Sequence, residues 1–102
     1  MVARGDIWWM ERPDGKGRPV LVISRDVANA VMRRVVVAQI TTTQRSSPSQ
    51  LPLGEPEGLH NDSVANFDDL MTVPKSLLTR RMGSLGTRLH ELCATLSVMA
   101  DC

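Results

Sequence analysis

Two residues with phosphate-binding chemistry stand at the ends of apolar segments. Arg18 lies where a loop enters the segment Pro19–Ser24, and Thr41 lies where Arg34–Ile40 passes into a polar loop. If these segments are neighbouring antiparallel strands, Arg18 and Thr41 emerge at the same end of the sheet. A guanidinium beside a hydroxyl then offers the donors that bind a phosphate group. Taken alone, the pattern has a simpler interpretation, which is a surface arginine and a solvated loop.

The sequence contains no other familiar catalytic constellation. It lacks Gly-x-Ser-x-Gly, a Walker loop, Gly-x-Gly-x-x-Gly and the paired histidines of metalloproteases. Asp68 and Asp69 are adjacent, but neighbours on a strand point to opposite faces, so we do not expect them to share a metal. His60 in an acidic loop and His90 near a helix start are interpreted as surface residues. We therefore expect no metal and no cofactor.

The elements that must position Arg18 and Thr41 can be predicted from the apolar patterning and the turn residues. The run Val20–Ile23 is continuously apolar, which indicates a strand covered on both faces. From Thr87 the period becomes helical, with Thr87 as the expected cap. The predicted strands are Asp6–Met10, Arg18–Ser24, Arg34–Thr41, an edge strand Gln50–Leu53, Ser63–Phe67 running on toward Val73, and Arg81–Leu85; Asp26–Met32 and Pro74–Leu78 are predicted helical turns, and the final helix aligns Leu89, Leu92, Cys93, Leu96 and Met99. This order predicts a mainly β (α+β) fold, a small antiparallel barrel with a C-terminal helix.

Length and composition fit one small globular domain, residues 1–102. The 102 residues are 42% hydrophobic and 23% charged. No apolar run approaches the roughly 18–20 residues that span a bilayer, and the first residues do not resemble a signal peptide, so we expect no membrane association. Cys93 and Cys102 lie too far apart for a zinc motif and are too few for a disulfide framework. We expect both to be reduced, which fits a cytoplasmic location.

Basic residues are concentrated in the first half of the chain. Residues 1–51 hold eight basic and four acidic side chains, whereas residues 52–102 hold four basic and seven acidic ones. Ten of the twelve basic residues are arginine, whose planar fork of donors matches phosphate. Arginine-rich codon usage explains this bias equally well.

Five segments form an ordered series along the chain: Arg4-Gly5-Asp6-Ile7-Trp8, Arg18–Ser24 followed by Asp26 and Asn29, Ala38–Thr42, Asp62–Asn66, and Met82–Leu85 with the final helix. In this order they resemble the MazF/PemK family, the toxin halves of bacterial toxin–antitoxin pairs. The resemblance implies an SH3-like barrel of the CcdB/PemK type that works as a homodimer. It also implies a ribonuclease that cuts single-stranded RNA at a specific sequence without metal, and an antitoxin that blocks the RNA groove. In the family, an arginine beginning the second strand and a threonine ending the third carry catalysis; here these are Arg18 and Thr41.

The implied chemistry suits these residue types. The 2′-hydroxyl of RNA can attack the adjacent phosphorus, giving a cyclic phosphate and a free 5′-hydroxyl. A charged guanidinium can stabilise the non-bridging oxygens, and a threonine hydroxyl can hydrogen-bond one of them. Arginine is a poor base at neutral pH, so the general base is not identified. Glu11 and Asp14 in the adjacent loop are candidates to assist.

Loops beside this centre should select the RNA sequence. Lys16, Thr42, Gln44 and Arg45 are the candidate RNA contacts. Trp8 or Trp9 could stack on a base, while at least one of the two should belong to the core or to a dimer contact. The cut motif, the target among messenger, transfer and ribosomal RNA, and the identity of the antitoxin are not evident from the sequence.

Two other functions fit the same barrel. One is a non-enzymatic toxin that binds DNA gyrase, as the CcdB toxins do through a C-terminal tryptophan-glycine pair. This chain ends Ser97-Val98-Met99-Ala100-Asp101-Cys102 without that pair. The other is an RNA-binding barrel without catalysis.

Overall fold

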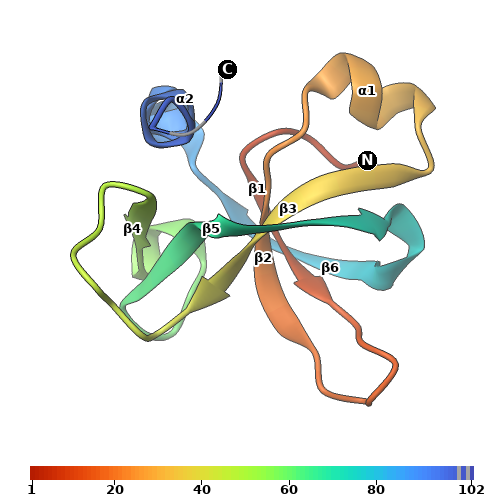
Figure 1. The fold of residues 1–102 in the computed structure, drawn as a ribbon. Helices are drawn as coiled ribbons and strands as arrows, with labels where there is room; N and C mark the ends of the chain where they lie inside the picture. The colour runs from red at the N-terminus through yellow and green to blue at the C-terminus, as the bar shows by residue number, and fades with distance from the viewer. Residues whose placement is uncertain (99, 101) are drawn as a thin grey trace.

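The structure is a computed structural model that describes residues 1–98, 100 and 102 (Figure 1). Within these residues, six strands form one antiparallel sheet in the order β4-β5-β3-β2-β1-β6. The strands are β1 (Asp6–Met10), β2 (Arg18–Val22), β3 (Arg34–Thr41), β4 (Gln50–Leu53), β5 (Ser63–Pro74) and β6 (Leu78–Ser84). The helices are α1 (Asp26–Val31) and α2 (Leu89–Leu96), and short 3₁₀ turns cover Glu55–Glu57, Lys75–Leu77 and Gly86–Arg88. This confirms the predicted mainly β fold with a C-terminal helix.

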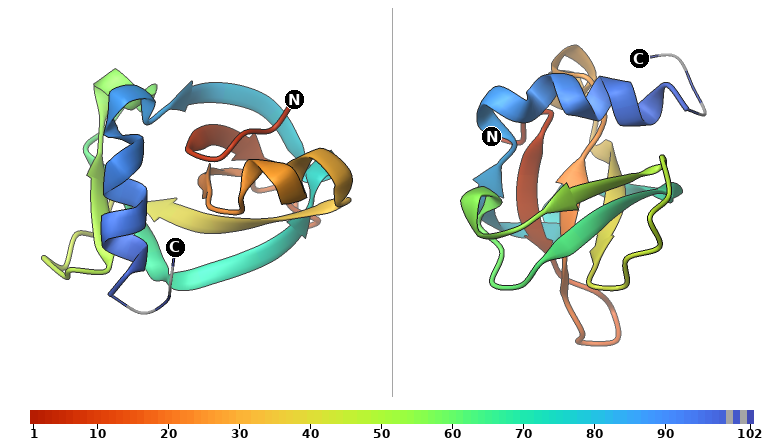
Figure 2. Two further views of the ribbon diagram at one scale, coloured as in Figure 1. Left: turned by 90° about the horizontal axis from the view of Figure 1, so that it is seen from above. Right: turned by 90° about the vertical axis from the view of Figure 1, so that its left-hand side faces the viewer.

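The sheet is curled, and its two edges approach each other (Figure 2). The 3₁₀ turn that follows edge strand β4 lies against edge strand β6. A Cβ atom on Gly83 would lie 2.1 Å from the Glu57 carbonyl oxygen, and one on Gly58 would lie 2.2 Å from the Met82 carbonyl oxygen. Gly58 also has a φ of +94°, which favours glycine. Glycine at both positions therefore allows the two backbones to meet and close the barrel.

Apolar side chains cover both faces of the central strands, as the sequence predicted for Val20–Ile23. One core cluster, cluster A, contains Leu21 and Ile23 together with Phe67 and the helix residues Leu92 and Leu96. The other, cluster B, contains Val20 and Val22; its full membership is Met10, Val20, Val22, Val35, Val37, Val73 and Leu78. Alternate residues of β2 thus enter opposite clusters, which fixes the position of β2 in the sheet.

Helix α2 lies across one end of the curled sheet, next to β4 (Figure 2, right). Leu92 and Leu96 are buried as predicted, but Leu89 is 43% exposed, and Met99 lies outside the described residues. The predicted cap was wrong, because the helix begins after Arg88, and Thr87 belongs to the preceding 3₁₀ turn. None of the described helices is long and apolar enough to cross a membrane.

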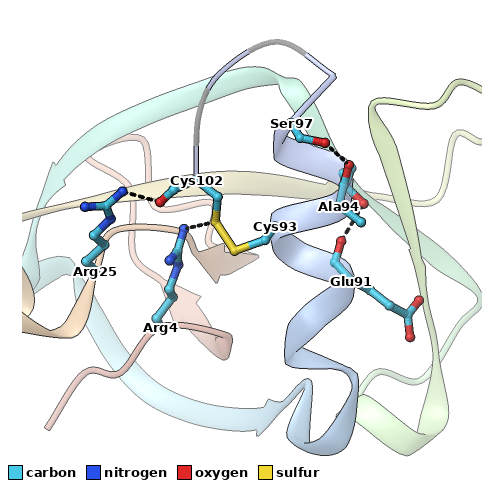
Figure 3. Close-up of a disulfide and its surroundings, with 8 residues drawn as sticks. Arg4, Arg25, Glu91, Cys93, Ala94, Ser97 and Cys102 are labelled. Atoms are coloured by element: carbon cyan, nitrogen blue, oxygen red, sulfur yellow. Dashed lines mark hydrogen bonds between the residues drawn. A yellow bond between two sulfur atoms is a disulfide. The ribbon is translucent and has the colours of Figure 1, made fainter.

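The prediction that both cysteines are reduced was wrong, because Cys93 and Cys102 form a disulfide (Figure 3). The two Cα atoms lie 5.4 Å apart although the residues are separated by nine positions in the sequence. The Arg4 Nη2 donates to Cys102 Sγ at 3.1 Å, and the Arg25 guanidinium donates to the main-chain oxygen of Cys102. Burial, and secondarily the charge of Arg25, lowers the pKa of Arg4. The expectation of a cytoplasmic location was argued in part from reduced cysteines, and the disulfide removes that argument.

Candidate active site

Arg18 and Thr41 lie on neighbouring strands and line the same cavity. Strands β2 and β3 pair antiparallel with Val20 opposite Gln39, and continuing this register places Arg18 opposite Thr41. Arg18 is the first residue of β2, and Thr41 is the last residue of β3. The cavity has a volume of about 400 Å³ and is lined by Trp9, Arg18, Pro19, Ile40, Thr41, Thr42, Leu59, His60, Asn61, Ser63 and Met82. We call it the Arg18–Thr41 cavity.

A hydrogen-bonded chain holds the Arg18 guanidinium. Its Nη1 donates to Gln39 Oε1, and Gln39 Nε2 donates in turn to Asp69 Oδ2 at 2.9 Å. The Arg18 Nε is buried and has no hydrogen-bond partner among the described residues. The guanidinium is thus anchored at one nitrogen, and Arg18 lines a cavity that could receive an anion. Gln39 lies in the segment Ala38–Thr42, one of those that resemble the family, but its sequence position did not indicate that it would anchor Arg18.

Asp69 reaches Gln39 because β5 bulges beside β3. Ala38 pairs with Leu70 whereas Gln39 pairs with Asn66, so the register breaks and residues 67–69 lie outside the regular pairing. A bulge of this kind redirects side chains. The neighbouring Asp68 turns to another partner and accepts a hydrogen bond from Ser49 Oγ at 2.6 Å. The two carboxylates thus have separate partners. Among the described residues, no three or more His, Cys, Asp or Glu side chains are grouped so that they could hold a metal ion.

The Thr41 side chain takes part in the turn that ends β3. Its Oγ1 accepts the N–H of Thr43 at 3.1 Å. This bond uses a lone pair of the oxygen and not the hydroxyl proton, so Thr41 can still donate to a phosphate oxygen. Arg18 and Thr41 together therefore present the two kinds of donor that the sequence analysis expected at one rim.

The two tryptophans have different surroundings. Trp8 packs against cluster B, and its Nε1 donates to Asp6 Oδ2 at 3.3 Å. Trp9 lines the Arg18–Thr41 cavity, and its ring lies against Gly17, where a Cβ atom would be 2.4 Å from the ring. The Arg80 guanidinium lies 6.0 Å from the centre of the same ring. Trp9 is therefore the aromatic wall of the cavity, and Trp8 is a packing residue.

The loop before β5 supplies the opposite wall of the cavity. Thr41 pairs with Val64 near the start of β5, which brings the preceding residues to the Thr41 end of β3. Leu59 is buried, and the exposed His60 and Asn61 line the cavity beside it. The interpretation of His60 as a surface residue is confirmed, and the structure adds that it lines this cavity. The amino-acid sequence did not indicate that His60 lines the cavity, because the position of its loop depends on the pairing of β5 with β3.

The four predicted RNA contacts are distributed over different places. Thr42 lines the Arg18–Thr41 cavity. Arg45 lines an adjacent hollow of about 230 Å³, which Arg18 and Thr41 also border. Gln44 lines a separate hollow with Glu55, Glu57 and Arg88, and Lys16 lines neither hollow that contains Arg18. The structure thus brings two of the four, Thr42 and Arg45, together with the pair.

Arg88 contacts the turn that precedes the cavity-lining residues Leu59–Asn61. Its Nη1 lies 3.2 Å from the buried Glu57 carboxylate, its Nη2 donates to the Pro52 carbonyl at 2.9 Å, and its Nε donates to Glu91 at 2.8 Å. The hydrogen bond with Glu91 is the main cause that raises the pKa of Arg88 and lowers that of Glu91. One guanidinium therefore ties the turn after β4 to β4 and to α2.

Comparison with known proteins places the chain in a family. Residues 3–99 match the model of the PemK-like, MazF-like toxins of type II toxin–antitoxin systems. A Mycobacterium tuberculosis relative named "Probable endoribonuclease MazF5" is 39% identical over 103 residues, covering 98% of this chain and 94% of that protein. The fold of the Mycobacterium tuberculosis toxin MazF-mt6 superposes with a TM-score of 0.81 at 31% identity, covering 91% of this chain and 93% of that one.

A further solved structure has the same fold at lower sequence identity. It is an endoribonuclease in complex with its cognate antitoxin from a mycobacterial species, with a TM-score of 0.83 at 23% identity, covering 96% of this chain and 93% of that one. The family model matches nearly the whole chain, and the Mycobacterium tuberculosis relative aligns with this chain over nearly the full length of both proteins. The chain therefore belongs to the PemK-like, MazF-like toxins of type II toxin–antitoxin systems.

Proposed function

We propose that this protein is an endoribonuclease toxin that cleaves single-stranded RNA at a specific sequence, without metal, by attack of the 2′-hydroxyl. The observation that carries the proposal is that Arg18 and Thr41 line one cavity, from opposite positions on β2 and β3. The family and the relative named as an endoribonuclease support the enzyme class. The expected products are a cyclic phosphate and a free 5′-hydroxyl.

In this mechanism Arg18 binds the scissile phosphate and stabilises the negative charge that grows on its non-bridging oxygens. Its anchoring by Gln39 keeps the guanidinium in one orientation before RNA arrives, so little reorganisation is needed during the reaction. Thr41 donates its hydroxyl proton to a second oxygen. Loss of one such donor typically slows the chemical step by on the order of 10²–10³.

Base recognition in the proposal uses the walls around this pair. Trp9 is placed to stack on an unpaired base, because its ring lines the cavity. Thr42 and Arg45 border the two hollows that contain Arg18. Gln44 lies between Thr42 and Arg45 in the loop after β3, and Lys16 lies in the loop before β2; both would contact flanking nucleotides. Messenger RNA is the first target to test, with transfer and ribosomal RNA as the other substrates.

The proposal includes two protein partners, a cognate antitoxin and a second copy of the chain, and a cytoplasmic location, where its RNA substrates lie. The family description, a toxin of a type II system, supports the antitoxin. For the homodimer, α1 and the residue after it expose Val27, Val31 and Met32 by 78%, 78% and 55%. An apolar face of this kind commonly marks a protein interface. A sedimenting species of monomer mass at micromolar concentration would contradict the dimer.

The test is cleavage of a long single-stranded RNA of known sequence by the purified protein in EDTA, with mapping of new 5′-hydroxyl ends. Arg18→Ala and Thr41→Ala should each leave the thermal melt nearly unchanged and sharply slow cleavage. Wild-type cleavage rates in an Arg18→Ala variant would refute the assigned roles. RNA retardation on gels without new ends would indicate an RNA-binding barrel, and inhibition of gyrase supercoiling would indicate a CcdB-like toxin.

A further inference from the structure

The proposed reaction requires a group that removes the proton of the 2′-hydroxyl, and neither Arg18 nor Thr41 can do so. A guanidinium stays protonated at neutral pH, and a neutral threonine hydroxyl is too weak a base to take a proton from another alcohol. The base should lie within reach of the phosphate that Arg18 binds. The inference below rests on the proposed function and identifies this missing group.

The lining of the Arg18–Thr41 cavity contains one candidate. Among the described residues that form its walls, Arg18 and His60 are the ones with titratable side chains. The remaining polar side chains there, Thr41, Thr42, Asn61 and Ser63, are neutral, and the rest of the lining is apolar or aromatic. Histidine is the side chain that normally exchanges its proton near neutral pH.

The nearby carboxylates have other partners. Glu11 accepts a hydrogen bond from Thr79 at 3.3 Å, and Asp14 forms an ion pair with Arg12 at 3.4 Å. Neither borders the Arg18–Thr41 cavity. Asp69 borders the adjacent hollow, which Arg18 and Thr41 also line, but its carboxylate accepts a hydrogen bond from Gln39. The two loop carboxylates that the sequence suggested as assisting groups are therefore less well placed than His60.

The backbone on both sides of His60 is fixed, although its side chain is exposed. Leu59 is buried in cluster A, and its N–H donates to the Gly54 carbonyl at 3.2 Å. On the other side, the Asn61 carbonyl accepts a hydrogen bond from Ser63 Oγ at 2.9 Å. The backbone that carries His60 is thus fixed at the cavity wall, and the imidazole is open to solvent.

We propose that His60 is the general base of the reaction. The imidazole takes the proton of the 2′-hydroxyl while the bond from the 2′-oxygen to phosphorus forms. The bond from phosphorus to the 5′-oxygen breaks, and that oxygen takes a proton from water in the open cavity. Arg18 stabilises the phosphate oxygens during this exchange. The hydroxide that remains takes the proton from the imidazolium, directly or through solvent, so that His60 and the water are regenerated and no further reactant is needed.

The charged side chains around His60 are Arg18, which shares the cavity with it, and Asp62, Glu55, Glu57 and Arg88, which border a separate hollow.

The experiment compares His60→Gln with His90→Gln, which removes the other histidine of the chain. His90 lies on α2 and does not line the cavity. Single-turnover cleavage is measured from pH 5 to 9 on an oligonucleotide that carries the mapped cut site. Affinity is measured with the same oligonucleotide bearing a 2′-deoxy sugar at that site, which cannot react. Thermal melts establish that each variant is folded.

We expect His60→Gln to slow cleavage by on the order of 10²–10⁴, the usual contribution of a general base, and to bind the 2′-deoxy oligonucleotide within about threefold of wild type. The wild-type rate should rise with pH and level off, whereas the variant rate should rise without levelling because hydroxide becomes the base. Free imidazole should accelerate a His60→Ala variant. His90→Gln should behave as wild type.

The outcomes separate this inference from the proposed function. If wild type cleaves, Arg18→Ala does not, and His60→Gln matches wild type in rate and pH profile, the base assignment is wrong and the proposed function stands. If His60→Gln loses affinity for the 2′-deoxy oligonucleotide in proportion to its rate, His60 binds RNA and is not the base. If wild type produces no 5′-hydroxyl ends, the proposed function itself fails.

Discussion

Replacing Gly17 with alanine should displace Trp9 from the cavity wall. A Cβ atom at Gly17 would lie 2.4 Å from the Trp9 Cε2 and Nε1 atoms and 2.5 Å from Cζ2. Ordinary carbon contacts lie near 3.5–4.0 Å, so the ring must move by about 1 Å or more. Insertion of a methyl group into a packed site typically costs about 1–3 kcal/mol. For a domain of this size each kcal/mol lowers the Tm by roughly 4–8 °C.

The same displacement should weaken RNA binding. If Trp9 stacks on one base, loss of that contact costs about 1–3 kcal/mol, or roughly 5- to 150-fold in affinity. Gly17→Ala and Trp9→Ala should therefore weaken binding of a non-cleavable oligonucleotide to a similar extent. The double variant should bind no more weakly than Trp9→Ala alone, because the two changes remove the same contact.

A double-mutant cycle on thermal stability provides the decisive readout. In the Trp9→Ala background the added methyl group meets no ring, so Gly17→Ala should be neutral or slightly stabilising through its effect on the unfolded chain. Gly15→Ala is the loop control: its Cβ would meet nothing within 4 Å, but its φ of +80° strains an alanine. An equal destabilisation by Gly17→Ala with and without the Trp9 ring would refute the steric reasoning.

Three further predictions test the supports of the site and the disulfide. Gln39→Met removes the bond that anchors Arg18, so kcat should fall about tenfold or more with KM nearly unchanged. Asp69→Asn keeps an acceptor for Gln39 and should lower kcat less. An effect confined to KM would contradict a positioning role for Gln39. Arg88→Met leaves the buried Glu57 without its cation and should destabilise the fold by about 1–3 kcal/mol, measured by urea unfolding. The control Glu91→Gln changes a half-buried partner near the surface and should change stability little. Because the Arg88 hydrogen bond lowers the pKa of Glu91, the stabilisation by this pair is present at neutral pH and is lost as acid protonates the carboxylate. A stability difference between wild type and Glu91→Gln that grew with acid would contradict this sign. Cys93→Ser breaks the disulfide and should lower the free energy of unfolding by about 2–3 kcal/mol. Thiol titration of the unreduced wild-type protein should find no free thiol. Two free thiols would contradict the disulfide.

The strands that surround the site could be predicted because their signals are local. Turn residues and β-branched runs determined β1, β3 and β4 with the bounds that the structure shows, Asp6–Met10, Arg34–Thr41 and Gln50–Leu53. The apolar run of β2 predicted a strand with two covered faces, and both clusters are present. From these strands alone, antiparallel pairing was enough to bring Arg18 and Thr41 to one rim.

Local signals were insufficient where the outcome depended on a distant partner. Thr87 has the chemistry of a cap, but Gly86–Arg88 form a 3₁₀ turn and the helix begins one residue later. The two cysteines are nine residues apart in the sequence, and the fold brings their Cα atoms within 5.4 Å of each other. Spacing in the sequence does not encode that proximity.

The amino-acid sequence by itself determined the order of the elements, the family resemblance and the Arg18–Thr41 pair, because periodicity, turn residues and strand ends are properties of short segments. Tertiary structure decided which residues complete the cavity. The bulge in β5 brings Asp69 to Gln39, the contact between Gly58 and β6 sets the loop that carries His60, and the small size of Gly17 admits the Trp9 ring. Each of these depends on a contact between segments far apart in the chain, which forms when the whole sheet curls and closes.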